Sequence, residues 1–429
     1  MKPKYSLGGE NLDIKWLNTM RVYDEYEKRF ALANAKRDFS LPVTSESKKK
    51  ITDGVKRMLA YDEKLIPSVS HMTEISKDVF DGYDVTHLKY ETWEGFYGCA
   101  ELYMPHGDRK VPLAFVFCGH GKNGRLSEGY VSMATRLVKM GIAVMVPDNI
   151  GQGSRSFQGH WDVVSPFYCG YTLQGLIVME SIALIRHMTD HPRVDKEKIA
   201  ACGNSGGGTL CLFLAALAPE LSVLSSSGYP SQFSYIFEKE RKHCACNLLP
   251  GCMHGPDMWE ILSLFAPKPL LIEEGRNDNL IPNDLFLRSA RKVSHIYLQM
   301  GAEKNFKSSQ TDTTHPWVNA DRKIIAEFLA KHLGVEKPCC EDDRDDSVLK
   351  MSENWDIRFP SDSLTVDDLV AKLSGKKIPN NLQLSDIYKP MSGGKPLDKE
   401  DIVPDIGRGS VMRILAQMEC ALEEKNEIL

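Results

Sequence analysis

Ser205 is embedded in a glycine-rich segment, GNSGGG (203–208). An apolar run (198–202) precedes this segment and another (209–217) follows it, which predicts a strand, a sharp turn and a helix. The spacing is Gly-x-Ser-x-Gly, which in this context typically presents a serine hydroxyl as a nucleophile on a strained turn. An ordinary glycine-rich turn is the alternative. Neither GNSGGG nor a second glycine-rich segment, GHGKNG (119–124), has the spacing of a nucleotide-phosphate loop.

A serine hydroxyl is too weakly acidic to attack an ester alone, so it needs a base and a carboxylate that orients the base. Our candidate for the carboxylate is Asp278, because it follows a buried apolar run and would lie at the same sheet edge as Ser205. Glu273, Glu274 and Asp284 are its competitors. The two glutamates lie within or at the end of that run, and Asp284 is expected to cap the next helix.

The expected base is His315. It lies before the last helix of the alternating pattern, and Pro316 directly after it favours an extended backbone. A solvated loop histidine is the alternative. The chain order Ser205, Asp278 and then His315 is typical of triads on a parallel sheet, and it favours the catalytic interpretation.

Acyl transfer also needs backbone N–H groups that stabilise the oxyanion. Gly206, directly after the serine, would supply one of them. The segment FVFCGHGKNGR follows the first core strand, where the second donor belongs, and we expect the amide of Lys122 or, next, of Gly121 to serve. His120 in this segment is interpreted as a structural loop residue.

The elements that must position these residues alternate between short apolar runs and helical periodicity from about residue 112 to 334. This pattern predicts an α/β fold with a mostly parallel central sheet flanked by helices. Residues 295–301 are expected to form one of its strands. The expected division of the chain is an N-terminal helical segment (1–74), a catalytic domain (75–335) with a cap-like insertion (about 230–262), an acidic linker (336–347) and a small C-terminal helical module of unknown role (348–429).

Composition narrows the function further. The chain has 429 residues and a net charge of −5, so the basic excess usual in nucleic-acid-binding proteins is missing. No apolar run approaches a membrane span, and the first residues do not resemble a secretory leader. Of the 11 cysteines, Cys118, Cys202 and Cys211 fall within apolar runs. We therefore expect buried free thiols and a cytoplasmic protein without nucleic-acid or membrane partners.

From about residue 75 to 334, the chain resembles the acetyl xylan esterase and cephalosporin deacetylase group of the α/β-hydrolase superfamily, which is related to the dienelactone hydrolases. The segments that carry this resemblance are CGHGKNG, PDNIGQGSR, VDKEKIAACGNSGGG, CNLLPG and APKPLLIEEGRNDNLIP. The resemblance implies hydrolysis of small acyl esters, often acetyl groups on sugars. It also matches Ser205, Asp278 and His315 to the family's triad, and Lys122 to the residue whose amide serves the oxyanion hole.

The expected insertion contains a group of metal-ligating residue types, namely His243, Cys244, Cys246, Cys252 and His254. Their C-x-C-x5-C-x-H spacing is not that of a usual structural zinc site. The similar CNLLPG region of the family carries no metal, so we interpret the cysteines as packed thiols beneath a lid. The sequence thus predicts no metal and no cofactor.

These observations predict a serine carboxylic-ester hydrolase that acts on small-molecule esters through a Ser-His-Asp acyl-enzyme mechanism. Two alternatives stay open: a serine peptidase or aminopeptidase of the same fold, and a binding protein that keeps the fold without activity. The C-terminal module is a candidate for homo-oligomer formation.

Overall fold

The computed structural model describes residues 5–7, 10–12, 42–161, 163–233, 244–250, 252, 255–315, 317–380 and 382. The part of the expected C-terminal helical module after residue 382, together with His243 and His254, lies outside these residues. At the N-terminus, β1 (Tyr5–Leu7) pairs antiparallel with β2 (Glu10–Leu12), so these residues of the expected N-terminal helical segment form strands.

A nine-stranded sheet forms the centre of the fold, in the order β11-β10-β9-β8-β6-β7-β5-β4-β3. The strands from β6 to β11 pair in parallel, whereas β3, β4 and β5 are antiparallel and β5 joins β7 antiparallel. The expected mostly parallel sheet is therefore confirmed. The strands are β3 (Ser70–Phe80), β4 (Tyr83–Glu91), β5 (Tyr97–Pro105), β6 (Val111–Phe117), β7 (Ala143–Pro147), β8 (Val194–Asn204), β9 (Val223–Ser227), β10 (Leu270–Gly275) and β11 (Phe306–Thr311).

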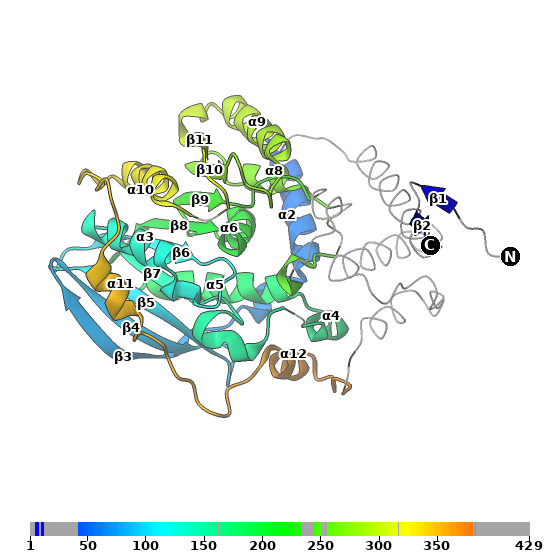
Figure 1. The fold of residues 1–429 in the computed structure, drawn as a ribbon, viewed down its shortest axis with the longest axis horizontal. Coiled ribbons are helices and arrows are strands. Elements are labelled where there is room, and N and C mark those ends of the chain that lie inside the picture. The colour runs from blue at the N-terminus through cyan, green and yellow to red at the C-terminus, as the bar shows by residue number, and fades with distance from the viewer. Residues whose placement is uncertain are drawn as a thin grey trace.

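Helices cover both faces of this sheet (Figure 1). The apolar residues of α3 and α10 pack on one face, and those of α5 and α6 pack on the other, which gives two hydrophobic clusters separated by the sheet. The helices are α2 (Ser45–Leu59), α3 (Glu128–Lys139), α4 (Ser165–Cys169), α5 (Leu173–Thr189), α6 (Gly206–Leu217), α8 (Met258–Ser263), α9 (Asn283–Gln299), α10 (Asn319–Leu333), α11 (Asp346–Ser352) and α12 (Val366–Ser374).

The strand expected over residues 295–301 is wrong, because α9 extends to Gln299. The buried residues of this helix, among them Leu285, Phe286, Val293 and Ile296, recur at helical spacing, and the apolar run is the end of that stripe. The strand that follows is the polar β11, which lies at the edge of the sheet.

The described part of the chain after α10 packs on the sheet and its helices. Val348 and Trp355 belong to the hydrophobic cluster of α3, and Val366 and Leu369 of α12 belong to the cluster of α5. Buried Arg125 connects this C-terminal part to the sheet. It pairs with Glu101 and Asp148 and donates a hydrogen bond to the carbonyl of Trp355 at 2.6 Å.

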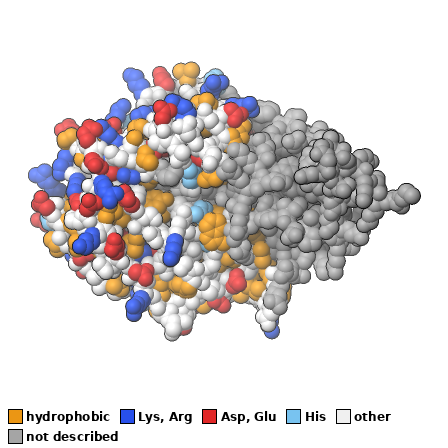
Figure 2. Space-filling view, in the orientation of Figure 1, with side chains coloured by type: hydrophobic (Ala, Val, Ile, Leu, Met, Phe, Trp, Pro, Cys, Tyr) orange, Lys and Arg blue, Asp and Glu red, His pale blue; other side chains and the backbone are white. Residues whose placement is uncertain are grey.

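Charged side chains of both signs are mixed over the visible face of the described residues (Figure 2), without a large area of one sign. Within the described residues, none of the helices combines the length and the apolar character that a membrane crossing needs.

Candidate active site

Ser205 lies at the sharp turn between β8 and α6, at the carboxyl end of a central strand. Its backbone angles, φ 58° and ψ −117°, are rare for a residue with a side chain. The turn is tight: a Cβ on Gly203 would lie 2.5 Å from the carbonyl carbon of Gly207, and one on Gly207 would overlap the carbonyl oxygen of Phe117. The glycines are therefore required for the backbone to hold Ser205 in this conformation.

Two neighbouring loops at the same sheet edge bring Asp278 and His315 together. The loop after β10 and the loop after β11 are joined by a hydrogen bond from the Asn277 amide to the Thr313 carbonyl at 2.9 Å. The Nδ1 atom of His315 then lies 2.6 Å from Oδ2 of Asp278, whose Oδ1 accepts the Leu280 amide at 2.6 Å. With Asp278 accepting, the Nδ1–H tautomer of His315 is favoured, which leaves a lone pair on Nε2.

The serine turn and the histidine loop are also in contact. The side-chain amide of Asn204, directly before the serine, donates to the backbone carbonyl of His315 at 3.4 Å. The Nε2 atom of His315 is buried and has no hydrogen-bond partner among the described residues. No direct hydrogen bond joins Ser205 and His315 within this part of the chain, a looseness that is common in catalytic pairs without substrate.

The loop after β6 lies against the serine turn. A Cβ on Gly119 would lie 2.9 Å from the Cβ of Ser205, and one on Gly206 would lie 2.8 Å from the His120 ring. The Gly121 amide donates to Oε1 of Gln152 at 3.1 Å, so this amide already has an acceptor. Of the three expected oxyanion donors, Gly121 thus has a competing partner, and the roles of Gly206 and Lys122 stay predictions.

Two other buried carboxyl groups, those of Glu273 and Glu274, lie near Asp278. Burial raises the pKa of Glu274 well above its ordinary value, and the adjoining Asp278 carboxylate adds to this effect. Burial, with the nearby Asp321, raises the pKa of Glu273 to about 8. For Asp278, burial acts upward, but the hydrogen bond and charge of His315 outweigh it and the pKa is lowered. These shifts favour the ionised form of Asp278 and the protonated form of Glu274.

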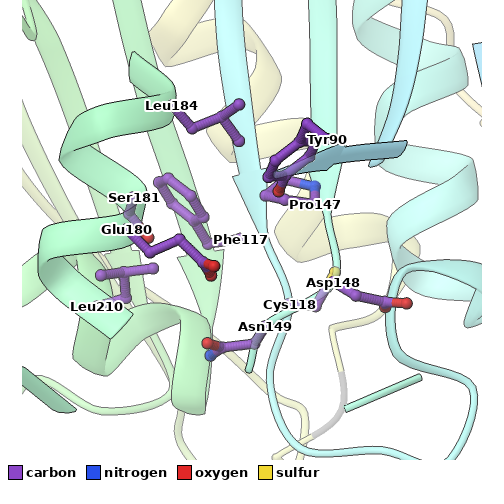
Figure 3. A pocket seen from close by; sticks show the side chains of 10 residues that line it. All are labelled: Tyr90, Phe117, Cys118, Pro147, Asp148, Asn149, Glu180, Ser181, Leu184 and Leu210. Carbon is purple, nitrogen blue, oxygen red and sulfur yellow. The ribbon is translucent and has the colours of Figure 1, made fainter. Parts of the chain in front are cut away.

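An open groove of about 1040 Å³ begins at this loop. His120, Gly121 and Lys122 line one end of it, and Arg344 and Asp356 from the C-terminal segment line the other. A second cavity, between β6, β7 and α5 (Figure 3), has a volume of about 10 Å³ and is lined by residues such as Asp148 and Glu180. It has room for about one water molecule, so it is too small for an ester substrate.

Comparisons with known proteins indicate the class of enzyme. A family model described as acetyl xylan esterase (AXE1) matches residues 59–244. The chain is a hydrolase of the serine esterase type. The matched range contains Ser205, whereas Asp278 and His315 lie beyond its end, so their assignment depends on the geometry above.

Similar proteins support the same fold. The hydrolase is 22% identical over 205 residues to a Bacillus subtilis (strain 168) protein named "Putative hydrolase YtaP". The matched stretch is 47% of this chain and 69% of the relative. Among solved structures, it is similar to methylesterase BT1017, with a TM-score of 0.59 and 20% identity over 82% of this chain and 78% of that one. A structure from Bacteroides fragilis described as a "putative acetyl xylan esterase" has a TM-score of 0.55 and 18% identity. This match covers 67% of this chain and 82% of that one.

Three of the expected cysteines are buried free thiols in the hydrolase, namely Cys118, Cys202 and Cys211. In the insertion, the expectation of packed free thiols is wrong for one pair, because the structure joins Cys244 and Cys246 as a disulfide. The sequence reasoning also missed what surrounds this pair. His120 and His160, from two distant loops, lie beside the two sulfur atoms.

Proposed function

We propose that the protein hydrolyses small acyl esters, above all acetyl esters of carbohydrates, with Ser205, His315 and Asp278 as its catalytic triad. The observation that carries this proposal is the 2.6 Å contact between His315 and Asp278 at the same sheet edge as the strained serine turn. Support for the acetyl group comes from the acetyl xylan esterase family match.

In the proposed mechanism, Nε2 of His315 takes the proton of the Ser205 hydroxyl while its oxygen attacks the ester carbonyl. Asp278 holds the imidazole in the required tautomer and stabilises its positive charge. The amides of Gly206 and Lys122 donate to the oxyanion. His315 then protonates the leaving alcohol, and afterwards activates the water that releases the acid and regenerates Ser205.

The test is a Ser205→Ala variant assayed on p-nitrophenyl acetate and on acetylated xylo-oligosaccharides. We expect kcat to fall by roughly 10⁴-fold or more, as in other serine triads. Labelling of the wild-type protein by a fluorophosphonate probe, and its loss in Ser205→Ala, would identify the reacting residue. Hydrolysis that persists undiminished in Ser205→Ala would refute the assignment.

The ester class needs a separate comparison, because a similar structure is named as a methylesterase. In an acetyl ester the sugar is the alcohol, whereas in the methyl ester of a sugar acid it is the acyl part. We expect higher kcat/KM on acetylated sugars than on methyl uronates, and no comparable rate on p-nitroanilide peptides. The reverse ranking would leave the triad intact and change the substrate.

A further inference from the structure

Four side chains with metal-ligating atoms converge beside the serine turn. One ligand atom each from His120, His160, Cys244 and Cys246 lie within 4.8 Å of one another. His120 comes from the loop after β6, His160 from the loop after β7, and the two cysteines from the insertion after β9. The last three side chains are buried, and His120 is partly buried.

Nε2 of His120 lies near the ligand atom of each of the other three side chains. Nε2 of His120 lies 2.9 Å from Nε2 of His160, 2.9 Å from Sγ of Cys244 and 3.2 Å from Sγ of Cys246. Ligand atoms around zinc lie roughly 3.3 to 3.8 Å apart, given bonds of about 2.0 to 2.3 Å. Small rotations of the side chains would therefore open the cluster enough to admit the ion.

Hydrogen bonding prepares His160 and the two sulfur atoms for a cation. Nδ1 of His160 lies 2.7 Å from the carbonyl oxygen of Ile150, so Nδ1 must donate and the neutral ring presents a lone pair at Nε2. A carbonyl partner of this kind commonly orients zinc-bound histidines. The side-chain amide of Asn247 lies 3.6 Å and 3.8 Å from the two sulfur atoms, which suits thiolates because they accept hydrogen bonds.

One proton cannot satisfy this arrangement. Nε2 of His120 faces the lone pair of His160 and both sulfur atoms, yet a proton on it can point to only one of the three. A divalent cation serves all four atoms at once. Two thiolates also neutralise its charge, which favours a buried site.

We propose that His120, His160, Cys244 and Cys246 bind one zinc ion when the two cysteines are reduced. Four protein ligands leave no open coordination position, so the site is structural. The ion would fasten the insertion to the loop of Gly119–Lys122, whose His120 ring packs on Gly206. Its effect on hydrolysis rests on the proposed function; the binding of zinc does not.

The disulfide between Cys244 and Cys246 is the competing state, because its sulfurs cannot both be thiolates. The first test measures metal in the full chain, purified under reducing conditions without chelator or added metal. We expect about one zinc ion per chain by mass spectrometry of the elements. Replacement by Co²⁺ should give thiolate-to-metal charge-transfer bands and the intense visible bands of a tetrahedral site.

Variants assign the ligands. The Cys244→Ser/Cys246→Ser protein should lose the zinc and the cobalt bands, and His160→Ala should weaken zinc binding at least about tenfold. The matched control is Cys340→Ser, a partly exposed free cysteine, which should keep the metal. Ser205→Ala should also keep it while losing hydrolysis, so the two proposals fail separately.

The proposal is overturned if the reduced wild-type protein neither contains zinc nor binds added Zn²⁺ or Co²⁺ with these spectra. It is equally overturned if the double cysteine variant keeps the metal. A third contrary result is a disulfide between Cys244 and Cys246 that persists in excess reductant, as shown by thiol counting and peptide mapping.

Discussion

Glu274 near the end of β10 and Asp278 just after it are interacting carboxyl groups: Asp278 acts with burial to raise the pKa of Glu274, and Glu274 acts with His315 to lower that of Asp278. A raised pKa favours the neutral form of the buried glutamate, which can donate a hydrogen bond to a carboxylate. Two side chains, His315 and Glu274, thus stabilise the ionised form of Asp278 in addition to the backbone amide that it accepts.

Glu274→Gln should keep kcat within a few-fold of wild type, because glutamine is neutral and retains a donor for Asp278. Glu274→Ala removes that donor, and we expect kcat to fall about tenfold, in line with the loss of one hydrogen bond to a charged group. Steady-state kinetics over a pH series would check this. If Glu274→Gln were as impaired as Glu274→Ala, the carboxyl group would have another role.

Asp278→Asn should lower kcat by about 10⁴-fold, because an amide can hold His315 in the wrong tautomer. The matched control is Asp284→Asn, at an exposed residue in the first turn of α9 that pairs with Arg288. That variant should have wild-type kinetics. Equal losses in both proteins, with intact folding by circular dichroism, would contradict our choice of the acid.

Glu273 makes the free energy of unfolding depend on pH. Folding raises its pKa from 4.5 to about 8, so the native state keeps a proton that the unfolded state has already lost in this range. The stabilisation is complete below the unfolded-state pKa of 4.5 and is lost as the pH rises through the folded-state pKa of about 8. The wild-type protein should therefore lose more stability than Glu273→Gln between about pH 5 and about pH 8.

Urea unfolding of both proteins at the two pH values measures this difference. The slope from one such group cannot exceed about 1.4 kcal/mol per pH unit. Identical pH dependence in the two proteins would show that Glu273 ionises normally in the fold.

Gly207→Ala should lower the free energy of unfolding by about 2 kcal/mol or more, because the added methyl group would overlap the Phe117 carbonyl oxygen. Gly129→Ala is the control. Its nearest neighbour would be the Trp317 carbonyl oxygen at 3.4 Å, and alanine is a better helix former in α3 than glycine. Thermal unfolding should separate the two variants, and equal stability would contradict the tight packing of the serine turn.

The sequence predicted the elements that carry their own local pattern. The apolar runs of β8 and β10, the glycines around Ser205 and the order of Asp278 and His315 were all readable from spacing. The strand β11 was missed because its residues, FKSSQT, are polar and lie at the sheet edge, where no apolar pattern is required.

Contacts between distant segments left no such signal. His120, His160 and the Cys244–Cys246 pair come from three loops, so no local spacing could have indicated that they meet. The raised pKa of Glu274 was also unpredictable, since it depends on burial and on a neighbouring carboxylate rather than on residue type.

Arg125 follows the Gly119–Lys122 loop closely, yet its carbonyl partner Trp355 is 230 residues further along the chain. During synthesis, which proceeds from the N-terminus, the guanidinium must wait for most of the protein to leave the ribosome before it can make this bond. A nascent chain released before Trp355 would contain Ser205, Asp278 and His315 but would lack the hydrogen bond that holds Arg125, just after the loop beside them.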